Sequence, residues 1–321
     1  MRIERLSAEN SRTQGPGRRA WYAQHNPEHL RGVASVVERA LAERGSAGAR
    51  APGGAIVLGA GACTEVPLER LARACAPVTL VDLDRSGMEQ ARRSLPHALR
   101  TRVELLRLDL TGGVSDTLAA LLREPPWADL ARLGAHAVVE AAARCLESCP
   151  VADPPMLAEL RGRRFGLVLS SLALTQLFGL PLLDALDTIG QAAPEALSEA
   201  SLSPDYQAAA NQFRRRVALA HLDLLAALLA PAGAAALVSD LTGYLAPPTS
   251  APPSAPREAL PVLPPEALNL PVELRARFAV RGAPHRWEWR VTTPTRTQPG
   301  RAYAVGGYVL RAKPVSSAPA V

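Results

Sequence analysis

The segment Ala55-Ile-Val-Leu-Gly-Ala-Gly61 decides the fold. Its apolar start, residues 55–58, predicts a strand that is buried on both faces of a parallel sheet. Gly59 and Gly61 follow, and because glycine has no Cβ, the backbone there can turn sharply and approach a ligand closely. A second apolar run further along, Val78-Thr-Leu-Val-Asp82, ends in a carboxylate. A strand–turn–helix–strand unit with an acidic end is typical of folds that bind ribose hydroxyls, so we expect an adenosine-containing ligand.

The segment between these strands predicts a helix over residues 64–75, whose apolar positions recur at helical spacing. Thr64 is a suitable N-cap, and Glu65 favours the positive end of the helix dipole. A dinucleotide pyrophosphate needs that helix end free of negative charge, so Glu65 argues against NAD. The same glutamate suits a ligand with its own ammonium group. S-adenosylmethionine, which carries an ammonium and no phosphate, fits this pattern.

Two further strand-like runs, Val103–Leu110 and Arg164–Ser171, are followed near the end of the chain by Arg286–Val291 and Tyr303–Arg311. Together with the glycine turn and the run that ends at Asp82, they resemble the class I S-adenosylmethionine-dependent methyltransferases. The resemblance implies an α/β, Rossmann-like fold with a seven-stranded, mostly parallel sheet and helices on both faces. It also implies an antiparallel C-terminal strand pair, an N-terminal helical cap, and S-adenosyl-L-methionine as the cofactor.

The resemblance places the cofactor at the carboxyl ends of the strands. We favour Asp82 over Asp84 for the ribose, with Leu83 packing on adenine. Asp109 could accept a hydrogen bond from the adenine amino group, or could simply close a turn before Thr111. The candidate cofactor-binding residues are Gly59, Ala60, Gly61, Glu65, Asp82, Leu83, Asp109, Leu110 and Ser170.

Methyl transfer mainly requires that the nucleophile be aligned with the methyl group and that water be excluded, so the sequence specifies no catalytic residue. The segment Ser170-Ser-Leu-Ala173 lacks the Asn/Asp-Pro-Pro-aromatic motif of base amino methyltransferases. A small-molecule acceptor is therefore expected by elimination. Candidate acceptor-site residues are Tyr22, Ser171 and Gln176. Ser171 and the neighbouring Ser170 could equally cap the helix that follows them. Segments 15–30, 172–178 and 247–265 could roof the acceptor pocket.

The segment His25-Asn-Pro-Glu-His29 matches the inverted zinc-protease pattern H-x-x-E-H. Asn26 and Pro27 favour an N-cap and first helical residue, which would leave His25 outside the helix and the two histidines on different faces. Four cysteines, Cys63, Cys75, Cys145 and Cys149, lack a metal-ligand spacing and are expected to be buried as small apolar residues. No metal is predicted.

Composition favours a chain that does not bind nucleic acid. The formal net charge is +6, but the arginines are scattered among acids, and Lys313 is the only lysine. No secretory leader follows Met1, and the apolar stretch 217–238 contains His221, Asp223 and Pro231. We therefore expect a cytoplasmic protein without a membrane span, whose oligomeric state is open.

The predicted organisation has an N-terminal helical cap segment, 1–50, with a helix from Pro27 to about Arg44. A methyltransferase-like domain, 51–313, follows, with a helical insertion at 112–163 and a proline-rich loop at 247–265. Residues 314–321 form a tail that we expect to be disordered. Prolines divide the insertion into two expected helical pieces.

Two other functions remain open at this stage. An NAD(P)-dependent oxidoreductase shares the glycine turn and the acidic strand end. A non-catalytic methyltransferase-like binding module is the other alternative. It is kept open by Val57, where the resembled family often has an acidic residue, and by Cys63, where it often has a third glycine.

Overall fold

The run 55–58 forms strand β1 (Ala55–Leu58), and all four of its residues are buried. β1 lies between two parallel neighbours, β2 (Val78–Asp82) and β4 (Phe165–Ser171). The parallel part of the sheet is completed by β3 (Val103–Arg107) beside β2 and by β5 (Leu229–Ala246) beside β4. The computed structural model describes residues 22–45, 53–155, 157–250, 252 and 255–313.

Antiparallel strands complete the sheet after β5. β9 (Gly300–Ala312) pairs with β5, and β7 (Phe278–Val280) and β8 (His285–Thr292) both pair with β9. The strand order is β3-β2-β1-β4-β5-β9-β7, with β8 on β9 and β6 (Glu258–Pro261) on β5. The predicted α/β class, mostly parallel sheet and antiparallel C-terminal pair are confirmed. The predicted count of seven strands was wrong, because the described residues form nine.

The two strands that the sequence did not reveal have weak signals. β7 has only three residues, and β6 is a four-residue strand that is exposed throughout and ends in a proline. β6 lies within the segment 247–265, which was expected to be a loop. Its residues 258–261 pair instead with Thr242–Leu245 of β5, so part of the proline-rich segment is an edge strand.

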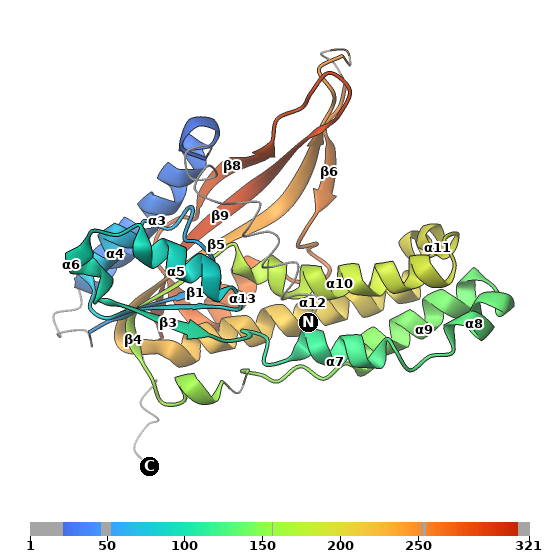
Figure 1. Cartoon of the computed structure of the whole chain (residues 1–321), viewed down its shortest axis with the longest axis horizontal. Helices are drawn as coiled ribbons and strands as arrows, with labels where there is room; N and C mark the ends of the chain where they lie inside the picture. The colour runs from blue at the N-terminus through green and yellow to red at the C-terminus, as the bar shows by residue number, and fades with distance from the viewer. Residues whose placement is uncertain (1–21, 46–52, 156, 251, 253–254, 314–321) are drawn as a thin grey trace.

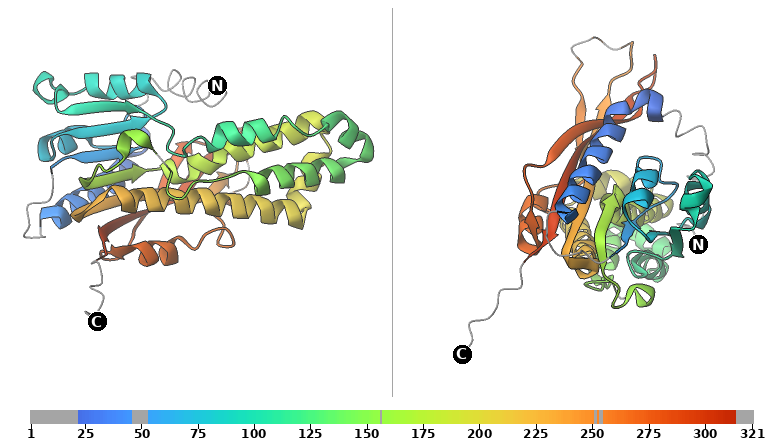
Figure 2. Two further views of the ribbon diagram at one scale, coloured as in Figure 1. Left: turned by 90° about the horizontal axis from the view of Figure 1, so that it is seen from below. Right: turned by 90° about the vertical axis from the view of Figure 1, so that its left-hand side faces the viewer.

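One face of the sheet is covered by α3 (Pro27–Gly45) and three shorter helices. α3 packs on β4, β5, β8 and β9, and its valines share an apolar cluster with β1 and β4. Figure 2 shows α3 lying along this face. The three other helices are α4 (Leu68–Ala74), α5 (Arg85–Arg93) and α6 (His97–Arg100). The helix predicted from Pro27 is confirmed.

The opposite face packs against a second apolar cluster, to which long and shorter helices contribute. They are α7 (Val114–Leu121), α8 (Trp127–Leu133), α9 (Ala135–Ser148), α10 (Ala173–Ala192), α11 (Ala196–Leu202), α12 (Pro204–Leu228) and α13 (Leu270–Arg277). The long helices α9, α10 and α12 contribute most of its helical residues. The insertion therefore contains three α-helices and a 3-10 turn, Ala158–Leu160, where two helical pieces were predicted. Gly134, with φ +114°, separates α8 from α9, a break that the proline pattern did not reveal.

Two extensions project beyond the carboxyl ends of the parallel strands. The last β4–β5 pair is Ser171 with Val238, yet β5 continues well past it to Ala246 beside β9. β6 and β8 flank this antiparallel flap (Figure 1). On the other side, α8 to α12 form a bundle that extends away from the sheet (Figure 2). None of the helices in the described ranges is long and apolar enough to cross a membrane.

Candidate functional site

The turn after β1 is held by backbone hydrogen bonds to β2. Gly59 N–H and Ala60 N–H both donate to the carbonyl of Val81, each at 3.0 Å. Gly59 has φ +69° and Gly61 φ +46°, so the turn uses the left-handed region in which glycine is favoured. A Cβ on Gly59 would lie 2.6 Å from the Cβ of Ala173, whereas one on Gly61 would meet nothing within 4 Å. The backbone at Gly61 therefore faces open space.

Asp82 closes this turn from the end of β2. Its Oδ2 accepts from Gly61 N–H and its Oδ1 from Asp84 N–H, both at 2.8 Å. Burial is the main cause that raises the pKa of Asp82, while these backbone donors act in the opposite direction. Because a carboxylate has about four acceptor positions, Asp82 keeps acceptor capacity for a ligand beside these backbone donors. Asp84 lies against Gly87, and the preference for Asp82 as the ribose carboxylate stays a prediction.

Asp109 closes the turn before Thr111, and its predicted contact with the adenine amino group stays a prediction. β3 ends at Arg107, so Asp109 lies in the following turn rather than in the strand. Its Oδ1 accepts from Thr111 N–H at 2.8 Å and from the Thr111 hydroxyl at 2.7 Å, and its Oδ2 accepts from Gly113 N–H at 3.0 Å. Oδ2 therefore keeps one acceptor position that is not used by the turn.

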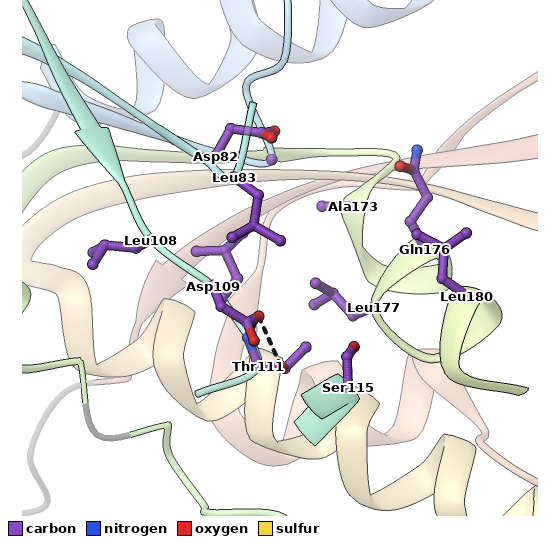
Figure 3. A pocket seen from close by; sticks show the side chains of 12 residues that line it. Asp82, Leu83, Leu108, Asp109, Thr111, Ser115, Ala173, Gln176, Leu177 and Leu180 are labelled. Carbon is purple, nitrogen blue, oxygen red and sulfur yellow. Dashed lines mark hydrogen bonds between the residues drawn. The ribbon is translucent and has the colours of Figure 1, made fainter. Parts of the chain in front are cut away.

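Gly59, Asp82, Asp109 and Thr111 line a pocket at the carboxyl edge of the sheet, with a volume of about 640 Å³ that includes space open to solvent. In Figure 3, Asp82 and Leu83 lie on one side and α10 on the other, with Asp109, Thr111 and Ser115 below. Among the described lining residues, two are carboxylates and none is basic. The lining residues are Gly59, Asp82, Leu83, Leu108, Asp109, Leu110, Thr111, Ser115, Ala173, Gln176, Leu177 and Leu180.

The α10 wall contains Ala173 and Leu177, which lie within the predicted segment 172–178 but were not named individually, and Leu180, which sequence reasoning missed. Ala173, Leu177 and Leu180, with the predicted Gln176, follow the i, i+3, i+4, i+7 spacing of one helix face. That spacing could have identified them once the start of the helix was known. α10 begins at Ala173, directly after Leu172 takes a left-handed conformation with φ +55°.

The helix predicted from Thr64 was wrong at its beginning. α4 starts only at Leu68, after Pro67 in the N-cap position and without a side-chain cap. The ring of a proline disfavours helical backbone at the residue before it, which explains why Val66 lies outside the helix. Thr64 and Glu65 lie in the connection and are not among the described pocket residues. The helix end is thus displaced from the glycine turn, and Glu65 does not lie at it. The argument against NAD that was based on the charge of Glu65 therefore fails.

Ser170 and Ser171 lie outside the described pocket lining, and as consecutive strand residues they point to opposite faces of the sheet. The Ser170 hydroxyl lies 2.9 Å from His221 Nε2 of α12, and both residues are buried. The Ser171 hydroxyl is buried and has no hydrogen-bond partner among the described residues. Neither hydroxyl caps the first turn of α10, whose N-cap position is Leu172.

The buried imidazole of His221 predicts an acid-sensitive fold. Burial lowers its pKa from 6.5 to about 4. Between these values the unfolded chain binds more protons than the folded one, so stability falls as the pH is lowered through this window. His29, whose pKa burial also lowers to about 4, adds a second contribution.

We expect His221→Gln to remove about half of the stability change that these two histidines cause between pH 7.5 and 5, a loss on the order of 1–3 kcal/mol. Urea unfolding at a series of pH values measures it. His136→Gln, at an exposed histidine, should keep the full slope. An unaltered slope in His221→Gln would show that this imidazole does not control the effect.

The candidate acceptor residue Tyr22 lies apart from the described pocket lining. It is buried, and its ring centroid lies 6.2 Å from that of His29. Residues 22–25 are helical, so His25 does not lie outside a helix as predicted, and the Asn26 side chain accepts from Arg290 N–H instead of serving as an N-cap. His25 is exposed and His29 is buried. Across the described ranges, no cluster of His, Cys, Asp and Glu could hold a metal ion. Residues 15–21 of the segment expected to roof the acceptor pocket lie outside these ranges.

No protein-family model and no curated protein matches the sequence. Similar solved structures include the N-methyltransferase NodS from Bradyrhizobium japonicum WM9 with S-adenosyl-L-homocysteine, at TM-score 0.42 and 9% identity over 96% of this chain and 99% of that one. A Geobacter sulfurreducens methyltransferase with S-adenosyl-L-homocysteine gives 0.36 and 13% over 90% and 92%. The glycopeptide N-methyltransferase MtfA with S-adenosylmethionine gives 0.33 and 14% over 85% and 93%. The solved structures named here are thus S-adenosylmethionine-dependent methyltransferases that are remote in sequence.

Proposed function

We propose that this protein transfers the methyl group of S-adenosyl-L-methionine to a small-molecule acceptor. The observation that carries the proposal is the chemistry of the pocket beside the glycine turn. It combines Asp82 and Asp109 with apolar walls and, among its described lining residues, contains no arginine or lysine. A ligand with an adenosine, a positive charge and no phosphate complements this lining better than a dinucleotide does.

Each part of the ligand has a counterpart in the chain. The free acceptor positions of Asp82 suit the two ribose hydroxyls. Leu83, Leu108 and Leu110 offer apolar surface for adenine, and Asp109 Oδ2 keeps an acceptor position for its amino group. The open backbone at Gly61 leaves room for the methionine part. Glu65 and Ser170 are not among these contacts.

When bound, the cofactor supplies a methyl group on a positively charged sulfur. The residues of this chain have to hold it, exclude water and orient the acceptor, and such alignment can supply most of the rate enhancement. α10 contributes the apolar Leu177 and Leu180 and the neutral amide of Gln176. The helical bundle and the flap flank the same edge of the sheet, which limits access to it (Figure 1). No catalytic base is assigned.

The first test is ligand binding. We expect isothermal titration to detect binding of S-adenosylhomocysteine but not of NADH, because the described lining residues include two carboxylates and no basic side chain to pair with a pyrophosphate. NADH binding without S-adenosylhomocysteine binding would support the oxidoreductase alternative. If neither ligand binds, the non-catalytic module is favoured. Acceptor screening with labelled S-adenosylmethionine then tests turnover.

A further inference from the structure

A second polar site lies where the start of α3 meets β8, outside the pocket described above. It contains buried or half-buried aromatic and imidazole rings in a chain with only 4% aromatic residues. His29 stacks on Trp289 with ring centroids 5.0 Å apart and an interplanar angle of 20°. Trp289 in turn lies 5.4 Å from Tyr303 of β9. The rest of the core is filled mostly by aliphatic side chains. A concentration of rings at one place is therefore unusual in this chain.

Three side-chain nitrogen atoms in this cluster can be assigned as hydrogen-bond donors. His29 Nδ1 accepts from the Trp287 indole N–H at 2.9 Å, and since an indole nitrogen only donates, the proton of the neutral imidazole must be on Nε2. Asn26 Oδ1 accepts from Arg290 N–H at 3.0 Å, which fixes the amide orientation and leaves Nδ2 as a donor. The third is the indole N–H of Trp289.

None of these three donors has a hydrogen-bond partner among the described residues. Asn26 is 4% exposed and His29 is fully buried. Leaving a buried donor unpaired is costly, so one would be a minor defect but three together call for an acceptor.

The donors lie close together. Asn26 and His29 are one helical turn apart, since the Asn26 carbonyl accepts from Leu30 N–H in the helical pattern. The Asn26 side chain binds the residue directly after Trp289, on which His29 stacks. Trp289 and Tyr303 are half-buried, so the exposed part of each ring gives a ligand an apolar surface along which to enter.

We propose that Asn26, His29 and Trp289 form a subsite for the carboxylate of a planar, aromatic molecule. A carboxylate has enough lone pairs for three donors, and the rings of Trp289 and Tyr303 provide surface for a flat apolar body. We assign this molecule as the methyl acceptor, an assignment that rests on the proposed function.

Its position agrees with that role. Tyr303 pairs with Gly243 of β5, beyond the last β4–β5 pair, so the cluster is at the carboxyl edge. In the strand order, β4 and β5 lie between β1 and β9, so the molecule would have to extend across the ends of these two strands to reach the cofactor; the buried, unpartnered Ser171 hydroxyl ends β4.

The test titrates benzoate into the full-length protein with and without S-adenosylhomocysteine, using isothermal titration. Asn26→Asp keeps the oxygen that accepts from Arg290 but replaces the donor with a negative charge. Trp289→Phe keeps an aromatic ring but removes the N–H. We expect benzoate to bind the parent and to bind at least about tenfold more weakly to each variant. Benzylamine, which has a cation in place of the carboxylate, should not bind.

Gln24→Glu is the matched control, because it adds the same charge at an exposed position in the preceding turn. It should bind benzoate as the parent does. Urea unfolding establishes that each variant is folded, and if Asn26→Asp does not fold, Trp289→Phe still decides. No binding at millimolar benzoate, as when the donors hold only an ordered water, would overturn the subsite, and so would equal affinity in the variants. If S-adenosylhomocysteine binds and benzoate does not, this inference alone is overturned. If benzoate binds and S-adenosylhomocysteine does not, the proposed function alone is overturned.

Discussion

Asp82→Asn should weaken S-adenosylhomocysteine binding by roughly 100-fold or more, since two charge-assisted hydrogen bonds to ribose are lost or inverted. Both oxygens of Asp82 already accept backbone N–H groups, from Gly61 and Asp84. An asparagine therefore has to turn its NH₂ against one of these donors, which disturbs the turn as well as the ribose contact. Isothermal titration measures the loss of affinity.

Stability and binding are expected to respond differently to this substitution. Burial raises the pKa of Asp82, so its charge is held at a cost to the folded protein, and a neutral amide removes that cost. That gain opposes the cost of leaving one backbone N–H, of Gly61 or Asp84, without its acceptor, so the free energy of unfolding in urea should change less than the free energy of binding. Asp129→Asn is the control, because Asp129 is an exposed carboxylate that pairs with Arg132 on α8. Unchanged affinity in Asp82→Asn would place the ligand elsewhere.

The sequence was most informative where strands are buried on both faces. β1 and β4 are buried along their whole length, and their continuous apolar runs predicted both strands to within a residue. The sequence was least informative where the chain leaves the core. β5 continues into the flap with half-buried residues, so no apolar run marked its true end at Ala246.

In the candidate site, sequence reasoning identified groups whose environment is local. Asp82 and the glycine turn belong to one compact unit, and the pocket lies beside them. The environment of Ser170 depends instead on His221, which is fifty-one residues further along the chain. Whether its hydroxyl faces a ligand or a helix is decided by that packing. The pairing of Asn26 with Arg290 is likewise a long-range contact that no motif announced.

The helix end after the glycine turn depends on one residue that was overlooked. Pro67 prevents Val66 from taking helical backbone and delays α4 to Leu68. The reasoning that used Glu65 as a helix-end charge therefore failed. The remaining argument against a dinucleotide is independent of it, since it rests on the carboxylates and the missing basic side chains among the described pocket residues.

Gly59→Ala should destabilise the protein by roughly 2–5 kcal/mol, because it combines backbone strain with a collision. Gly59 has φ +69°, and its new Cβ would lie 2.6 Å from the Cβ of Ala173 at the start of α10. Gly162 is a matched control, since it has φ +74° and nothing within 4 Å of the added Cβ. Gly162→Ala should therefore cost only the strain, roughly 1–2 kcal/mol.

A double-mutant cycle in urea separates the two contributions. Ala173→Gly removes the opposing Cβ, so Gly59→Ala should cost less in that background, by roughly the 1–3 kcal/mol of the collision. The remaining cost should then match that of Gly162→Ala. Additive effects in the cycle would mean that the turn and α10 do not touch at this point. Gly59 and Ala173 both line the pocket. That result would therefore also remove the contact that joins the glycine turn to the α10 wall.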